Sequence, residues 1–190
     1  MLNKDIETIC PSSRQEWRKW LKKNHVSMQS VWLICYKKES NMPTISWSDA
    51  VDEALCFGWI DSTARPLDQQ RFLRYFSKRK QKSVWSKINK KKVELLIDEG
   101  KMMEAGYISI EIAKQNGSWV ILDDVEELLI PQDLEIAFKA KSGAKDFFLQ
   151  LSKSTQKAFL QKLVLAKRID TRQKRIVEIV ELSAQKSKGK

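Results

Sequence analysis

The chain has 190 residues and a formal net charge of +11 at pH 7. Hydrophobic residues make up 42% of it, which is enough to form the core of one domain, or of one domain and a second, smaller one. No stretch approaches the roughly 18 to 20 consecutive apolar residues of a membrane-spanning helix, and the first residues lack the apolar segment of a signal peptide. These properties exclude a membrane span and predict a cytoplasmic protein.

Two signals near the start predict a helix and then a buried strand. After an irregular lead-in over residues 1–11, Ser13 and Glu16 form a capping box, in which both side chains meet exposed N–H groups of a first helical turn. This helix extends to about Asn24. Residues 31–36 (VWLICY) are apolar on both alternating faces, which is typical of a strand buried on both sides.

A second capping box, formed by Ser46 and Asp49, opens a helix that ends at Gly58. Helical periodicity gives this helix an apolar stripe and an acidic face. The stripe is expected to face the core with Trp47, Val51, Ala54 and Leu55, and the solvent-facing side is expected to carry Asp49, Asp52 and Glu53.

Two aromatic runs follow, at residues 59–62 and 71–77, and they predict short strands that pair as a hairpin around a loop containing Arg65. Strand alternation places Arg74 on one face of the second strand, between two phenylalanines.

The rest of the chain predicts helices. Ser83 caps a helix over residues 83–99, and a second helix occupies residues 101–116. Residues 117–130 have no clear period and predict a link between two domains. The helices expected after the link span residues 131–141, 144–151, 154–168 and 170–184.

These elements predict a helix-rich α+β fold. In an N-terminal domain, residues 1–120, a small antiparallel sheet packs against helices. A C-terminal domain, residues 128–185, is entirely helical.

Metal and cofactor chemistry has no motif in this chain. The three cysteines never form a CxxC spacing and there is one histidine, so neither a disulfide framework nor a zinc site is expected. No glycine-rich phosphate loop and no GxSxG elbow occurs. We therefore expect no cofactor and no metal, and we expect Cys56, near a helix end, to be inert packing.

One group of residues is the strongest candidate for a ligand site. An arginine between aromatic rings pairs with a carboxylate or phosphate while its stem packs on the rings. The alternative is that Arg74 pairs internally with Asp61 and binds nothing. The candidate ligand-binding residues are Trp59, Asp61, Arg65, Arg74, Arg79 and Trp85.

The net charge is unevenly distributed. Residues 71–92 hold ten basic residues and no acidic one, residues 94–135 hold eleven acidic and two basic, and residues 139–175 hold eleven basic and two acidic. The basic blocks fit an anionic partner, either a small molecule or a protein, and allow weak, nonspecific binding of nucleic acid. The simpler interpretation is that they are solvated helix faces.

Seven stretches together carry a family resemblance. They are EWRKWLKKNH (16–25), VWLICYKK (31–38), DAVDEALCFGWIDS (49–62), RFLRYFSKRK (71–80), SVWSKIN (83–89), IPQDLEIAF (130–138) and LAKRIDTRQKRIVEIVELSA (165–184). In these stretches, which run nearly end to end, the chain resembles the YdeI/OmpD-associated family, also called bacteriocin-protection proteins. The resemblance implies a role in survival against bacteriocins and cationic antimicrobial peptides, and it implies no catalytic mechanism.

The favoured hypothesis is a non-enzymatic stress or bacteriocin-protection protein that acts through an unidentified ligand or partner. The alternatives are a small-molecule enzyme that uses an Asp61/Arg74/Trp pocket and a nonspecific nucleic-acid binder. A protein with a charge of +11 repels cationic peptides at long range, so we expect protection to be indirect or to use a local acidic pocket.

Overall fold

The computed structural model describes residues 6–187, and side chains through residue 183. The chain splits into two compact units, Met1–Trp119 and Val120–Lys190. The elements are β1 (Thr8–Ile9), α1 (Arg14–Asn24), β2 (Ser30–Tyr36), a 3-10 helix η1 (Lys38–Ser40), α2 (Trp47–Cys56), β3 (Trp59–Pro66), β4 (Arg71–Lys78), α3 (Lys87–Asp98), α4 (Glu104–Gln115), α5 (Asp123–Glu126), α6 (Gln132–Lys139), α7 (Ala144–Gln150), α8 (Lys153–Val164) and α9 (Ile169–Ser187). The predicted α+β class is confirmed.

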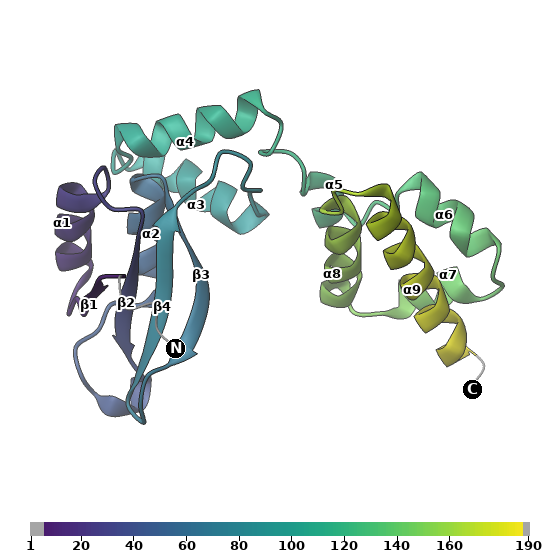
Figure 1. Ribbon diagram of the computed structural model, residues 1–190, viewed down its shortest axis with the longest axis horizontal. Helices are drawn as coiled ribbons and strands as arrows, with labels where there is room; N and C mark the ends of the chain where they lie inside the picture. The colour runs from purple at the N-terminus through teal and green to yellow at the C-terminus, as the bar shows by residue number, and fades with distance from the viewer. Residues whose placement is uncertain (1–5, 188–190) are drawn as a thin grey trace. The chain divides into compact units, whose positions relative to one another are not determined.

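The N-terminal unit is built on a four-stranded sheet with the order β1-β2-β4-β3 (Figure 1). Strands β2, β4 and β3 are antiparallel, as predicted, whereas β1 runs parallel to β2 and makes the sheet mixed. The lead-in over residues 1–11 was expected to be irregular, and that prediction is wrong at β1. The N–H of Trp32 donates to the carbonyl of Glu7 (2.9 Å), so the edge of β2 orders a segment too short to show a period of its own.

Side-chain caps mark the starts of α1, α2, α3 and α8. The hydroxyl of Ser13 accepts the N–H of Glu16 (3.3 Å), and that of Ser46 accepts the N–H of Asp49 (3.1 Å), as predicted. The predicted cap at Ser83 is wrong, because the N–H of Ser83 donates to Lys80 (2.8 Å) and closes a turn. Ser86 caps α3 instead.

The core of the N-terminal unit is aromatic. Trp17 of α1 is fully buried, its ring lies 5.2 Å from that of Trp20 and 5.3 Å from that of Phe76 on β4, and its indole N–H donates to the carbonyl of Ala50 on α2 (3.0 Å). Burying a ring of this size contributes on the order of 2 to 3 kcal/mol. The predicted inward position of Trp47 is wrong. This side chain is 58% exposed, because it lies at the first position of α2, beyond the end of that core.

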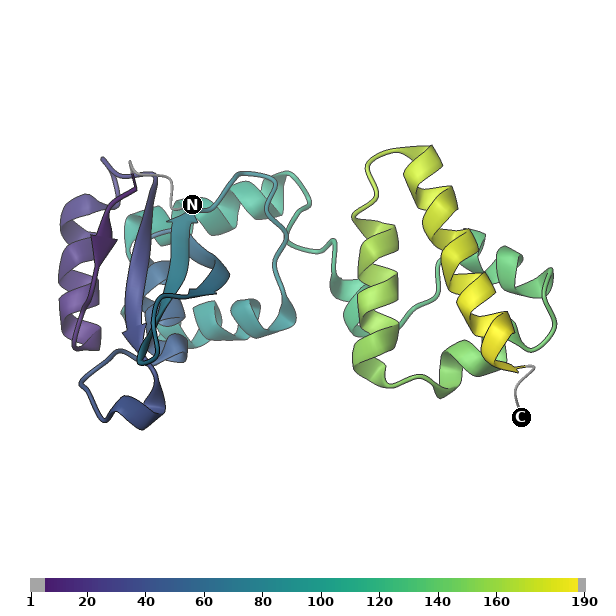
Figure 2. The same cartoon turned by 60° about the horizontal axis from the view of Figure 1, so that its bottom comes forward.

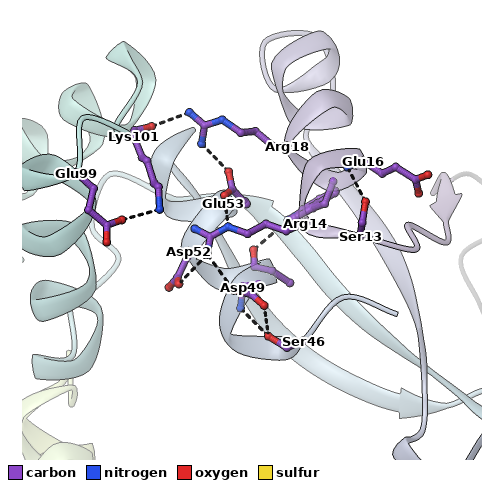
Figure 3. A network of polar contacts seen from close by, with 12 residues as sticks. Ser13, Arg14, Glu16, Arg18, Ser46, Asp49, Asp52, Glu53, Glu99 and Lys101 are labelled. Carbon is purple, nitrogen blue, oxygen red and sulfur yellow. Dashed lines mark hydrogen bonds and ion pairs between the residues drawn. The ribbon is translucent and has the colours of Figure 1, made fainter. Parts of the chain in front are cut away.

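Helices α1 and α2 are joined by a buried ionic network (Figure 3). Glu53 of α2 is 2% exposed, and its two oxygens accept from Nε of Arg14 (2.5 Å) and Nη1 of Arg18 (2.6 Å). Arg18 also donates to the carbonyl of Lys101 (2.8 Å). The predicted solvent-facing position of Glu53 is therefore wrong, because α1 covers that face with two arginines. A buried carboxylate with two such partners is fully satisfied.

Gly58 ends α2, as predicted, and it also lets α4 come close. Its φ is +70°, and a Cβ placed there would lie 2.7 Å from the carbonyl oxygen of Ala105 on α4. The N–H of Met103 donates to the carbonyl of Cys56 (3.1 Å) just before α4 begins. This contact holds the side of α4 next to the start of β3 and the end of β4, where the cavity described below is found.

The C-terminal unit consists of α5 to α9 within its described residues, and α9 packs against α6, α7 and α8 (Figure 2). The rings of Phe138 and Phe148 lie 5.3 Å apart in its core. The four helices expected after residue 130 are confirmed with small shifts at their ends. Within residues 6–187, the structure contains no helix with the length and apolar character needed to cross a membrane.

The segment 117–130, expected to be a link without structure, contains α5. The side chains of Leu122 and Val125 are buried in the C-terminal unit, and Glu126 pairs with Lys157 of α8 (2.6 Å). Part of the expected link is thus packed into this unit.

Candidate functional site

The six predicted site residues do not form one pocket. Asp61 and Arg74 face each other on the β3–β4 hairpin, whereas Arg79 and Trp85 line a separate cavity. Arg65 lies in β3 rather than in the loop, and its guanidinium carbon is 5.1 Å from the ring of Trp32. Trp59 is fully buried in the core, next to the ring of Trp20.

The predicted proximity of Asp61 and Arg74 is present. Nη1 of Arg74 is 3.0 Å from Oδ2 of Asp61. Trp59 and Trp85 were expected to line a pocket around this pair, but neither ring lies beside it. The ring next to Arg74 is that of Trp47. Its indole N–H donates to the same Asp61 oxygen (2.9 Å), and its ring lies 4.9 Å from the guanidinium of Arg74.

A cavity of about 400 Å³ opens beside this cluster, lined by Trp47, Asp61, Ile88 and Lys92 among others. Its charged groups are matched within the protein, because Lys92 pairs with Asp52 (2.5 Å) and Asp61 with Arg74. Nε of Arg74 is the one guanidinium nitrogen there that is buried without a partner. The arrangement favours the internal-pair interpretation, with Trp47 closing the pair from outside.

The second cavity, of about 290 Å³, lies where β4 ends. The N–H of Arg79 donates to the carbonyl of Gly58 (2.9 Å), which continues the pairing of β3 and β4 by one residue. After Arg79 the chain forms a turn over residues 80–83, and the side chain of Trp85 that follows is buried. The side of α4 completes the wall.

Arg79 is held firmly but has no anionic partner. Its guanidinium carbon lies 3.7 Å from the ring of Trp85, and Nη2 donates to the carbonyl of Val84 (2.8 Å). Nη1 is buried with no hydrogen-bond partner among the residues that the structure describes. Burial lowers the pKa of Arg79 to about 10, because an isolated charge is disfavoured away from water.

Arg18 provides the structural comparison. Its guanidinium also stacks on a ring, that of Phe57 (5.4 Å), and also donates to a backbone carbonyl (2.8 Å). It differs from Arg79 by its third contact, the carboxylate of Glu53. The missing carboxylate is the unusual feature of Arg79.

The rest of the cavity wall combines cationic and apolar side chains with the polar residues His25, Gln81 and Ser109. Lys78 and Lys80 flank Arg79, and Nζ of Lys78 donates to the carbonyl of Val26 (2.7 Å). None of the described residues that line the cavity is an aspartate or a glutamate. Val26 and Ile108 are 72% and 51% exposed, and both lie on its wall. The arrangement can accept an anionic group against Arg79 and an apolar group against α4.

Other chemistry has little support in this unit. Burial raises the pKa of the Cys56 thiol, which is fully enclosed by the core, so a thiolate nucleophile is disfavoured. Across the described part of the chain, no group of three histidine, cysteine, aspartate or glutamate side chains is placed to hold a metal ion.

Comparison with known protein families gives two matches. A family described as a domain of unknown function (DUF8412) matches residues 9–109, and the family described as bacteriocin-protection, YdeI or OmpD-associated matches residues 127–186. The chain belongs to the DUF8412 family and carries a C-terminal YdeI/OmpD-associated domain. No curated protein and no solved structure matches it.

The resemblance to the YdeI/OmpD-associated family is thus confirmed for the C-terminal domain, residues 127–186. The N-terminal stretches, expected to belong to the same family, match the DUF8412 model instead. The candidate cavity therefore lies within the DUF8412 part. The basic block at residues 71–92 is divided among β4, the following loop and α3, and Arg71, Arg74 and Lys92 within it pair with carboxylates. Nucleic-acid binding stays a prediction.

Proposed function

We propose that this YdeI/OmpD-associated protein contributes to bacteriocin protection without catalysis, by holding a small anionic ligand in the Arg79 cavity of its N-terminal unit. One observation carries the proposal. The guanidinium of Arg79 lines the cavity and is fixed by Trp85 and Val84, yet it meets no carboxylate among the residues that the structure describes. A guanidinium that is fixed in place without a carboxylate partner has a charge that a bound anion can balance.

The charge of the chain supports this mode of action. With a net charge of +11, the protein repels cationic peptides at long range, and the cavity has no acidic side chain with which to bind one. Protection is therefore indirect. The ligand is a small anion and the bacteriocin itself is not bound.

Mass spectrometry of retained small molecules tests the proposal on the full chain. Wild-type protein, Arg79→Met and Arg65→Met are purified in parallel and denatured, and the released molecules are compared. Arg65 is a matched control, because it also lies over a tryptophan ring but outside the cavity. We expect an anionic molecule that wild type and Arg65→Met retain and Arg79→Met loses.

The same variants connect binding with protection. Cells that produce Arg79→Met should lose survival against bacteriocin relative to cells that produce Arg65→Met at the same level. If Arg79→Met retains the same anions as wild type, the cavity is not the binding site and the proposal fails.

A further inference from the structure

The residues that line the Arg79 cavity restrict the chemical class of ligand that it can accept. We infer that this ligand is a small monocarboxylate with an apolar body, either a single ring or a short chain. The inference rests on the proposed function and specifies which anion the cavity accepts. Three features of the wall carry it.

The first feature is the number of donors that Arg79 has left. Trp85 lies 3.7 Å from its guanidinium carbon and covers one face, and Nη2 is committed to the carbonyl of Val84. A guanidinium carries five N–H groups, of which one on Nη2 donates to Val84 and the two on Nη1 are closed off from solvent without a partner among the described residues. Few donors therefore remain for a ligand, and a single carboxylate can use them. Phosphate is usually held by several donors together, such as a helix N-terminus or a nest of backbone N–H groups.

Helix α4 supplies no such group of donors. The residues with which it lines the cavity are Ala105, Ile108, Ser109 and Ile112, which lie along its side. The N–H groups of Met103 and Gly106 near its start already donate to backbone carbonyls (3.1 and 2.9 Å). The helix therefore presents mainly apolar surface to the ligand.

The second feature is exposed apolar surface at the cavity. Val26 and Ile108 are more than half exposed, although they adjoin the buried rings of Phe57 and Trp85. A ligand with an apolar body removes this surface from water, which is favourable in proportion to the area covered. A fully polar anion such as phosphate leaves it exposed.

The third feature is the absence of acidic groups on the cavity wall. A zwitterion such as an amino acid would bring an ammonium group that has no carboxylate to pair with and that Lys78 and Lys80 would repel. A volume of about 290 Å³ lies at the lower end of the range for small-molecule cavities, roughly 300 to 1,000 Å³. The ligand is therefore a small, purely anionic amphiphile.

Isothermal titration calorimetry of the full chain with four probes tests the class. Benzoate has both charge and ring, benzamide has the ring without the charge, acetate has the charge without the ring, and inorganic phosphate has charge alone. We expect benzoate to bind at least about tenfold more tightly than each of the others, because it alone makes both the charge-assisted hydrogen bond and the apolar contact.

Variants assign each preference to its side chain. Arg79→Met should abolish the preference for benzoate over benzamide, and Ile108→Asn should reduce the preference for benzoate over acetate. Arg79→Lys keeps a charge and should retain part of the first preference. Arg65→Met should behave as wild type. The comparison of probes on wild-type protein needs no variant, so the test stands even if one of them folds poorly.

The outcomes separate this inference from the proposed function. If phosphate binds in an Arg79-dependent way and benzoate does not, the carboxylate class is wrong and the anion site stands. If the wild type binds benzoate and benzamide equally, the class is also wrong. If benzoate binds Arg79→Met as tightly as wild type, both the class and the anion site are wrong.

Discussion

Replacing Arg79 by methionine should leave the N-terminal unit as stable as wild type or slightly more stable. Methionine keeps an unbranched stem on the ring of Trp85 and removes the unpaired charge. A pKa of about 10, well below that of an exposed guanidinium, corresponds to an unfavourable burial on the order of 3 kcal/mol. Loss of the charged hydrogen bond to Val84 costs about 1.5 to 3 kcal/mol, so the two effects nearly cancel.

Arg18→Met is the matched comparison, because Arg18 makes the same ring and carbonyl contacts and also pairs with Glu53 (Figure 3). Its removal leaves a buried carboxylate with Arg14 alone. Breaking a buried pair costs about 3 to 5 kcal/mol when no partner remains, so we expect about 2 to 3 kcal/mol here. That is a fall in melting temperature of about 10 °C for a unit of this size.

Tryptophan fluorescence measures both variants in the full chain. All seven tryptophans precede residue 120, so urea and thermal unfolding curves report the N-terminal unit. The pKa of Arg79 is lowered, so the cost of its charge is full below about pH 10 and shrinks as the pH rises above that value. The measurement therefore belongs at neutral pH. A loss above about 2 kcal/mol for Arg79→Met, similar to that for Arg18→Met, would refute the claim that Arg79 is an unmatched charge.

Three further experiments test the rest of the structure. Arg74→Ala should destabilise the N-terminal unit by about 2 kcal/mol, and Asp61→Asn in the same chain should restore about half of this loss, whereas additive losses in the double-mutant cycle would contradict the ion pair. Native protein should expose one reactive thiol to Ellman's reagent, that of Cys10, and denatured protein three. Burial raises the pKa of Cys35 to about 11, so this thiol stabilises the fold below about pH 9 and its contribution is lost as the pH rises through 11. Limited proteolysis with proteinase K should cut first within residues 117–130 but outside α5, and first cuts inside the later helices, identified by mass spectrometry of the fragments, would disprove the division into two domains.

Signals that act over a few residues predicted much of the fold. The caps at Ser13 and Ser46 and the end of a helix at Gly58 depend on side chains or backbone angles within one turn, and each was found as expected. Ser83 and Ser86 offer the same local signal. Burial of the intervening Trp85 decides between them, and this depends on the tertiary structure.

The errors arose where a distant segment changes the environment of a residue. Glu53 looks like a solvent-facing acid within its own helix, and it is buried because Arg14 and Arg18 reach it from a helix more than 30 residues earlier. Trp47 fits an apolar stripe by periodicity, yet it extends towards Asp61 and remains exposed. Neither partner can be chosen from the sequence alone, because many arginines and carboxylates satisfy the same local pattern.

Arg79 is unusual because no carboxylate among the described residues pairs with it. The sequence identifies Arg79 as a candidate site residue, but it does not show which arginines find a carboxylate in the fold. Arg18, Arg74 and Arg79 all stack on aromatic rings, and the aromatic and basic pattern around each is similar. In the structure, Arg18 and Arg74 each meet a carboxylate and Arg79 does not. For the first two, the free energy of burying the charge is offset inside the protein. For Arg79 the hydrogen bond to Val84 offsets part of it and no carboxylate among the described residues offsets the rest, whereas a leucine or methionine would fill the same space beside Trp85 without that cost. Unmatched burial of a charge in a cavity wall is therefore the physical property that distinguishes Arg79 from Arg18 and Arg74, and it is the reason for proposing Arg79 as the binding arginine.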